Sequence, residues 1–178
     1  MTLRLYNTLS RQKEEFMPLH GREVHMYVCG PNLYGPCHVG HAMSYIFFDV
    51  LRRYLEYQGY KVKHVQNFTD IEDRIIETAQ SLGTSVEELA ETYIERFSKE
   101  MDSLNVLRAH HNPRATEVID KMIEITQGLI AKGHAYVVDG DAYFRVRSDP
   151  DYGRLSGRSL EAMQAGARGE VDPRKEHP

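Results

Sequence analysis

The sequence predicts an α/β fold that begins with a parallel sheet and continues into a mostly helical region ending in a short β-hairpin. Two observations predict this class. A strand, a loop, a helix and a second strand follow one another over residues 24–66, and apolar residues recur at helical spacing over residues 85–132. A strand–helix–strand unit with a right-handed crossover gives two adjacent parallel strands, so residues 24–66 determine the class.

The first predicted strand is the apolar, β-prone run VHMYV at residues 24–28, which ends at the interrupting sequence CGP. The following helix starts at Gly40 and ends just before Gly59, a residue type favoured after a helix end. Its apolar residues recur every three or four positions and should form the buried face, whereas its charged residues should face away. The apolar set is Ala42, Ile46, Phe47, Val50, Leu51, Tyr54 and Leu55; the charged set is Arg52, Arg53 and Glu56.

The second predicted strand, YKVKHVQ at residues 60–66, alternates apolar and polar side chains. A further helix then starts at a capping box formed by Ser85 and Glu88. Another opens with Asn112 as N-cap and Pro113 in its first turn. Its expected buried face comprises Val118, Ile119, Met122, Ile123, Leu129 and Ile130.

The sequence after that helix predicts a hairpin. The runs AYVV and AYFRV flank a turn at residues 139–141, where Asp and Gly favour reversal of the chain. The tail that follows is rich in Asp, Gly, Pro and Arg, with one weak helical segment at residues 160–165. The sequence contains no internal repeat.

Composition excludes several classes of protein. The chain has 178 residues and a formal net charge of −4, so its bulk charge gives no reason to expect a nucleic-acid binder. It lacks an apolar run long enough to span a membrane, and its first residues lack the apolar core of a secretory signal, which predicts a cytoplasmic protein. Cys29 and Cys37 lie too far apart for a CxxC motif, so we expect reduced thiols rather than a disulfide framework.

The loop at residues 29–41 is the strongest candidate for a binding site. Ligands of parallel sheets bind beyond the carboxyl ends of the strands, and unpaired N–H groups at a helix start attract phosphate. Gly40 lets a nucleotide approach the backbone, and His38 and His41 can donate hydrogen bonds to oxygens that gain charge during nucleotidyl transfer. The two histidines are therefore predicted to be catalytic. The alternative is that they only cap the helix or pack in the turn.

The pattern His38-Val39-Gly40-His41 resembles the HIGH signature of class I aminoacyl-tRNA synthetases and related nucleotidylyltransferases. Longer segments resemble the N-terminal part of the cysteinyl-tRNA synthetase family over nearly the whole chain. They are YVCGPNLYGPCHVGH, FFDVLRRYLEYQGYKV, VQNFTDIEDRII, LYNTLSRQKEEF, PRAT, LIAKGHAY and YGRLS. The chain departs from this family at Gly35, where a polar residue is frequent, and at Met43, where an arginine is common.

This resemblance implies the first half of a Rossmann-like parallel sheet of the HUP type, followed by a helical insertion. It implies a ligase that uses ATP with Mg²⁺ to activate L-cysteine as cysteinyl-adenylate and then transfers it to tRNA(Cys). ATP is expected on the motif from Pro31 to His41, with contacts from His38, Gly40 and His41. A cytoplasmic monomer without membrane contact is expected.

The resemblance also implies a zinc ion that binds the thiolate of the substrate cysteine, with Cys29 as its first protein ligand. Zinc prefers a soft thiolate to a hydroxyl, so a metal can separate cysteine from serine where an apolar pocket cannot. The remaining Cys, His and Glu ligands of the family come from sequence beyond position 178. We therefore expect weak or absent zinc binding by the 178 residues alone. Cys37 is expected to be a packing residue.

Residues 67–73 (NFTDIED) follow the second strand and should lie near the first loop, at the same edge of the sheet. Thr69 and Glu72 fit a capping box, so a helix start explains part of this segment. The resemblance implies that Gly30, Thr69 and Asp70 also bind the substrate, with the Thr69 hydroxyl beside the amino-acid pocket.

The expected organisation is the N-terminal half of a catalytic domain over residues 1–110 and the start of a connective insertion over residues 111–178. The second half of the Rossmann fold, the lysine-rich KMSKS loop and the anticodon-binding region of the family are absent from the sequence. The 178 residues alone are therefore expected to be inactive. Two alternatives remain: a mycothiol-pathway enzyme that joins cysteine to an amino sugar, and a catalytically silent nucleotide-binding module.

Overall fold

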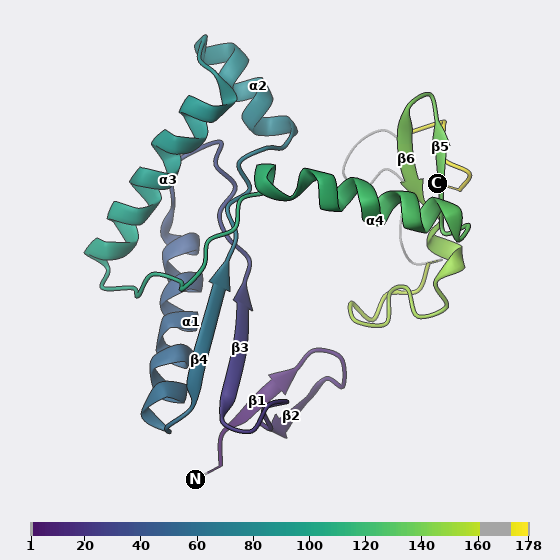
Figure 1. Cartoon of the computed structure of the whole chain (residues 1–178). Coiled ribbons are helices and arrows are strands. Elements are labelled where there is room, and N and C mark those ends of the chain that lie inside the picture. Colours follow the sequence, from purple (N-terminus) through teal and green to yellow (C-terminus); the bar gives the residue numbers. More distant parts are fainter. Residues whose placement is uncertain (1, 161–171, 178) are drawn as a thin grey trace. The chain divides into compact units, whose positions relative to one another are not determined.

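The structure, a computed structural model, describes residues 2–160 and 172–177 (Figure 1). Most of the weak helical segment predicted at residues 160–165 lies outside these residues. The chain divides into two compact units. Residues 18–119 form one unit, and residues 1–17 form the other together with residues 120–178.

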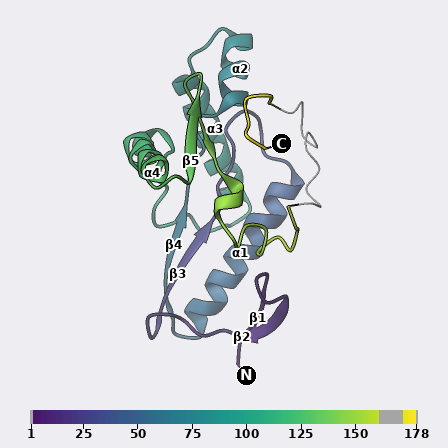
Figure 2. The same cartoon turned by 90° about the vertical axis from the view of Figure 1, so that its right-hand side faces the viewer.

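The unit of residues 18–119 contains the predicted strand–helix–strand arrangement. Strands β3 (Glu23–Val28) and β4 (Lys61–Gln66) pair in parallel, and helix α1 (Val39–Tyr57) connects them. Figures 1 and 2 both show α1 alongside this strand pair. Within the described part of the chain, no strand pairs with the second edge of β3. The α/β class is confirmed.

Helix α1 buries a different face from the predicted one. Arg52, expected to face away, is only 8% exposed, and its Nη1 donates to the carbonyl oxygen of Arg108 over 2.9 Å. Asp49 is also buried and accepts from the backbone N–H of Leu107 over 2.9 Å. Leu55 is buried as predicted. Most of the predicted face is exposed: Ile46 (40%), Phe47 (64%), Val50 (60%) and Tyr54 (37%). The prediction failed because the side of α1 that carries the charges packs against residues 105–110.

A third segment lies along β4. Residues His111 and Arg114 form parallel bridges with Val65 and Phe68, and the Asn112 side chain donates to the carbonyl oxygen of Gln66 over 2.9 Å. Asn112 is therefore not the N-cap that the sequence predicted. Its amide hydrogen-bonds to the β4 backbone, and a 3-10 turn, η1 (Thr116–Val118), precedes helix α4 (Ile119–Ala131).

Helices α2 (Asp73–Leu82) and α3 (Val86–Ser103) complete this unit. The predicted capping box at the start of α3 is present, because the Ser85 hydroxyl accepts from the Glu88 N–H over 3.1 Å. The capping box predicted for Thr69 and Glu72 is absent, since Glu72 is the N-cap of α2 and makes no side-chain capping bond. The core consists of Val28, Leu33, Tyr45, Phe68, Ile75, Ala79, Leu89, Ala90, Phe97 and Met101.

The other unit contains two hairpins. Strands β1 (Arg4–Asn7) and β2 (Gln12–Glu15) were not predicted, because they are short and mostly polar. Strands β5 (Ala135–Val138) and β6 (Asp141–Phe144) form the predicted hairpin, in which Asp139 and Gly140 adopt φ values of 50° and 88°. A short 3-10 turn, η2 (Val146–Ser148), follows β6.

The predicted buried face of α4 is wrong, since no residue of this helix is buried. Val118, Ile119, Met122 and Ile123 are all exposed. Helical spacing of the apolar residues therefore predicted the helix correctly, but it did not predict the exposure of its apolar side chains. In the part of the chain that the structure describes, no helix is long and apolar enough to cross a membrane.

Candidate functional site

The loop after β3 and the segment after β4 meet at the carboxyl ends of the two strands, as the sequence predicted. The N–H of Thr69 donates to the carbonyl oxygen of Pro31 over 3.3 Å, and Asn32 pairs with Thr69 in a parallel bridge. Residues from both segments therefore contribute to one surface. Ligands of parallel sheets bind at this edge.

Asn67 connects these two segments and was not identified from the sequence. Its Oδ1 accepts from the N–H of Gly30 over 2.9 Å and from the hydroxyl of Tyr27 over 2.8 Å. Because a backbone N–H can only donate, this contact fixes which amide atom of Asn67 is the oxygen. Nδ2 then faces Thr69 and donates to its Oγ1 over 3.2 Å. The sequence signal for this role is weak, since an asparagine after a strand is also an ordinary turn residue.

Gly30 must be a glycine because of the same contact between segments. A Cβ built at this position would lie 1.5 Å from the carbonyl oxygen of Asn67, which no side chain can accommodate without movement of the backbone. The absence of a side chain therefore allows the loop after β3 to approach the segment after β4. Its predicted role in substrate binding remains a prediction.

His38 and His41 cap helix α1 with their own rings. Nδ1 of His38 accepts from the N–H of Gly40 over 3.1 Å, and Nδ1 of His41 accepts from the N–H of His38 over 3.2 Å. The rings stack with their centroids 3.9 Å apart. The capping alternative is therefore part of the structure. It also corrects the expectation of unpaired N–H groups at this helix start, because the N–H groups of His38 and Gly40 already have imidazole partners.

This capping arrangement determines the tautomer of both rings. A neutral imidazole that accepts at Nδ1 carries its proton at Nε2, so His38 and His41 each have an Nε2–H group that can donate. Burial, followed by the neighbouring His38, lowers the pKa of His41, which favours the neutral ring. A Cβ at Gly40 would lie 3.0 Å from Cε1 of His38, so the glycine also gives this ring its space.

Cys29 has an exposed, reduced thiol. Its Sγ lies 3.8 Å from the carbonyl oxygen of Gly30, and the hydroxyl of Tyr45 lies 3.5 Å from the carbonyl oxygen of Cys29. Burial raises the pKa of Tyr45, so this phenol stays protonated and can donate. A tetrahedral zinc site needs four ligands. In residues 2–160 and 172–177, no group of three or more His, Cys, Asp or Glu side chains could hold a metal ion, so these residues do not complete a zinc site.

Asp70, predicted to bind substrate, is buried and already has partners. Its Oδ1 accepts from the N–H of Thr116 over 3.0 Å, and its Oδ2 accepts from the Thr116 hydroxyl over 2.6 Å. Both carboxylate oxygens therefore hold the start of η1. This geometry favours an indirect role for Asp70, through the position of its neighbour Thr69.

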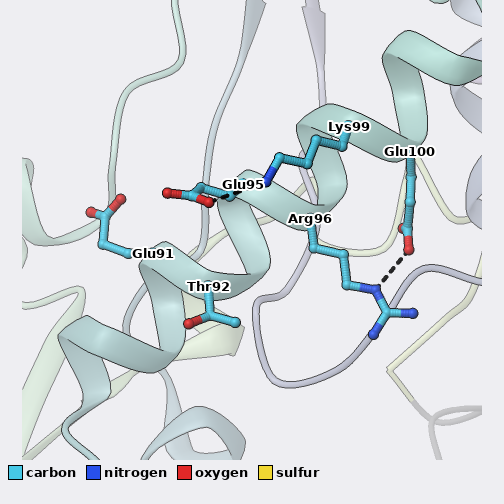
Figure 3. Close-up of a pocket in the computed structure, with 6 residues that line it drawn as sticks. All are labelled: Glu91, Thr92, Glu95, Arg96, Lys99 and Glu100. Carbon is cyan, nitrogen blue, oxygen red and sulfur yellow. Dashed lines mark hydrogen bonds and ion pairs between the residues drawn. The ribbon is translucent and has the colours of Figure 1, made fainter.

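Cys37 packs against the core, as predicted. Burial, followed by the neighbouring Glu100 carboxylate, raises the pKa of its thiol to about 11, so Cys37 is a poor nucleophile. Glu100 also borders a surface hollow of about 450 Å³ along α3 (Figure 3). The side chains that line this hollow form ion pairs between residues one helical turn apart. These pairs are Arg96–Glu100 at 2.7 Å and Lys99–Glu95 at 3.4 Å. Such pairs are typical of a solvated helix surface.

Comparison with known proteins gives a family. Residues 15–178 match the family described as tRNA synthetases class I (C) catalytic domain. The chain is 54% identical over 176 residues to the cysteine–tRNA ligase of Desulforamulus reducens, and 53% identical over 177 residues to that of Maridesulfovibrio salexigens. Each alignment covers 99% of this chain but only 36% of the relative. The chain thus spans about a third of the length of these relatives.

Solved structures share the fold at low sequence identity. Mycobacterium tuberculosis methionyl-tRNA synthetase in complex with methionyl-adenylate superposes with a TM-score of 0.57 at 18% identity, over 69% of this chain and 29% of that one. The Agrobacterium radiobacter K84 agnB2 LeuRS, in a ternary complex with tRNA and LeuAMS, gives 0.56 at 22% identity, over 66% and 16%. The fold, the motifs and the family match agree, and the chain belongs to the class I (C) tRNA synthetase catalytic-domain family.

Proposed function

We propose that this chain is the N-terminal part of a cysteine–tRNA ligase, in which it binds ATP and contributes to the activation of L-cysteine. The complete enzyme would form cysteinyl-adenylate with release of pyrophosphate and pass the cysteinyl group to tRNA(Cys). The observation that carries the proposal is the pair of stacked imidazoles at the start of α1, which leaves two Nε2–H donors beyond the carboxyl end of β3.

The proposed chemistry of this chain is positioning and stabilisation of charge. During adenylation the α-phosphorus of ATP becomes five-coordinate, and its oxygens gain negative charge. The Nε2–H groups of His38 and His41 would donate to these oxygens, while Gly40 leaves room beside the backbone. Because both rings are already held by the helix cap, little reorganisation accompanies the reaction. Mg²⁺ would neutralise charge on the phosphates when ATP is bound.

The amino-acid side of the site would be formed by Gly30, Thr69 and the segment around Asp70. Asn67 holds Gly30 and Thr69 in fixed positions relative to each other. Cys29 is the one exposed thiol at this edge, and we propose it as a zinc ligand. Its partners would come from sequence outside the 178 residues.

We propose residues 1–110 as part of the catalytic domain and residues 111–178 as the start of an insertion, in a cytoplasmic, monomeric enzyme. A mycothiol-pathway ligase would use the same adenylation step, but an amino sugar would accept the cysteinyl group. Identity to cysteine–tRNA ligases over 99% of the chain favours the synthetase. A silent nucleotide-binding module is the remaining alternative.

Cysteine-dependent exchange of pyrophosphate into ATP tests the proposal. The full-length protein that contains this chain should catalyse the exchange and charge tRNA(Cys), whereas residues 1–178 alone should give no appreciable exchange. Exchange without charging of tRNA, but with transfer to an amino sugar, would support the mycothiol-type enzyme. ATP binding without exchange by the full-length protein would identify a silent module.

The variant Cys29→Ser in the full-length protein tests the proposed metal ligand. It should reduce the zinc content and the preference for cysteine over serine together, because the zinc ion that Cys29 would bind also selects the substrate thiolate. Cys37→Ser is the matched control, since the thiol of Cys37 is partly buried against the core. Retention of zinc and of selectivity by Cys29→Ser would contradict the assignment.

A further inference from the structure

The segment that carries Thr69 is held from both sides. Thr69 pairs with Asn32 of the loop after β3 in a parallel bridge, and on the opposite edge Phe68 pairs with Arg114 in the same way. Backbone hydrogen bonds of 2.9 and 3.1 Å join Phe68 to residues 113–115. An extended segment with partners on both edges has little freedom to shift, so these neighbours determine where Thr69 lies.

Thr116 fixes the residue that follows Thr69 in the chain. Asp70 is only 4% exposed, so water can satisfy little of its carboxylate. Within the described part of the chain, both hydrogen bonds to this carboxylate come from Thr116, one from its N–H over 3.0 Å and one from its hydroxyl over 2.6 Å. Any residue except proline could supply the N–H, but only threonine or serine can supply this hydroxyl. The identity of residue 116 therefore affects how firmly Asp70 is held.

The contacts of Thr69 itself are longer than those of Asp70. Its N–H donates to the carbonyl oxygen of Pro31 over 3.3 Å, and its Oγ1 accepts from Asn67 over 3.2 Å. Hydrogen bonds weaken with distance, and the 2.6 Å bond between Thr116 and Asp70 is short and charge-assisted. The firmest restraint on this segment therefore lies at Asp70. The hydrogen of the Thr69 hydroxyl has no acceptor among the described residues, so it is available to a ligand.

We propose that Thr116 is a positioning residue for the amino-acid side of the adenylation site. Through Asp70 it sets the position from which the hydroxyl of Thr69 reaches the bound L-cysteine. This inference rests on the proposed function, in which Thr69 contacts the amino acid and Thr116 does not. Thr116 lies in the stretch that we propose as the start of the insertion, so one hydroxyl group would link that insertion to the amino-acid side of the site.

Thr116→Val and Thr116→Ser in the full-length protein form a matched pair of variants. Valine keeps the shape and the N–H but loses the hydroxyl, so it should raise the KM for L-cysteine in pyrophosphate exchange about tenfold, the effect of one hydrogen bond to a charged group. The KM for ATP should not change, because ATP would bind the other segment. Serine keeps the hydroxyl and should restore a KM close to that of the wild type. Added to Thr69→Val, Thr116→Val should have no further effect on the KM for L-cysteine, because the hydroxyl that it positions is already absent.

Ser85→Ala controls for a general loss of stability, since Ser85 caps α3 and its hydroxyl contacts Glu88 of that helix. An unchanged KM for L-cysteine in Thr116→Val, an equal rise in Ser85→Ala, or additive effects with Thr69→Val would overturn the proposal.

Hydrogen exchange of the Thr69 amide in the 178-residue chain tests the positioning without any chemistry. Thr116→Val should reduce the protection of this amide about tenfold, whereas Thr116→Ser should not. Unchanged protection in Thr116→Val would overturn the proposal. If the full-length wild type catalyses no pyrophosphate exchange, the proposed function fails, and the protection of the Thr69 amide still decides whether Thr116 holds this segment.

Discussion

His38 and His41 each use one ring nitrogen to hold the start of α1, which leaves the other for a ligand. Structural and chemical roles are therefore located on different atoms of the same side chain. Asn67 similarly uses both ends of its amide, the oxygen for Gly30 and the nitrogen for Thr69. This separation lets substitutions remove one role at a time.

His41→Asn and His41→Gln form a matched pair of variants for the full-length protein. Asparagine offers an oxygen close to the place of Nδ1 and should preserve the cap, whereas glutamine offers an N–H close to the place of Nε2. We expect His41→Asn to lower kcat for cysteine-dependent exchange by about 100-fold, the typical loss when a transition-state donor is removed. His41→Gln should retain more activity. A rise in KM for ATP with unchanged kcat would instead indicate ground-state binding.

Asn67→Ala should leave the N–H of Gly30 without its partner, with a loss of about 1–3 kcal/mol in the free energy of unfolding. Asn67→Asp keeps the accepting oxygen and should cost less. On the 178-residue chain, chemical denaturation measures the free energy of unfolding of each variant, and hydrogen exchange measures the protection of the Gly30 amide. Unchanged protection of the Gly30 amide in Asn67→Ala would show that the contact does not hold the loop.

His64 should make the stability depend on pH. Burial, then Arg52 and His110, lower its pKa, while Asp49 acts in the opposite direction. Because the pKa of His64 is lower in the folded chain, the unfolded chain binds the proton more readily. The contribution of neutral His64 to the free energy of unfolding is therefore complete above the ordinary histidine pKa, and it is lost as the pH falls through the lowered value. The free energy of unfolding should therefore decrease from about pH 7 to pH 5. His64→Gln should reduce this decrease. A stability–pH profile identical to that of the wild type would contradict the assignment of the decrease to His64.

The secondary-structure elements differ in what determines them. Helix α3 begins at a local capping box and continues for 18 residues, and all the information for its start lies within four positions. The parallel pairing of β3 with β4 is the usual result of a crossover that contains one helix, here α1. By contrast, the start of η1 depends on a contact with a residue distant in the sequence, because Thr116 donates twice to the carboxylate of Asp70.

Ser85→Ala tests how much the local signal contributes. Loss of the hydroxyl that accepts from Glu88 should reduce the free energy of unfolding by about 1 kcal/mol. Urea denaturation measures it, with Ser44→Ala on the exposed surface of α1 as the control. An effect no larger than that of the control would mean that tertiary packing, rather than the cap, fixes the start of α3.

The sequence predicted the α/β class, the parallel strand pair, the capping box of α3 and the meeting of residues 29–32 with residues 67–69. Each depends on local periodicity or on the rule that the carboxyl ends of parallel strands lie together. It did not predict the buried face of α1, because Arg52 and Asp49 are buried through bonds to backbone groups near residue 108. It missed Asn67 for the same reason, since its partner Gly30 lies 37 positions away.

The division of the whole chain into two units has a direct consequence for folding. Every residue of the core cluster lies between positions 18 and 119, as do the two histidines and Cys29. A chain of about 100 residues can bury enough surface to fold alone.

We therefore expect residues 18–119 to fold without the rest of the chain. Their amide NMR spectrum should overlay that of the 178-residue chain at the core positions. Collapsed, poorly dispersed signals would show that the second unit is needed for folding.

The second edge of β3 has no partner strand in the described part of the chain, and this affects how stability can be measured. Partly unfolded molecules can pair through such an edge and precipitate faster than they refold. Apparent melting temperatures would then shift with heating rate and sample concentration. Dilute samples in urea, checked for complete recovery on dilution, would give the equilibrium values.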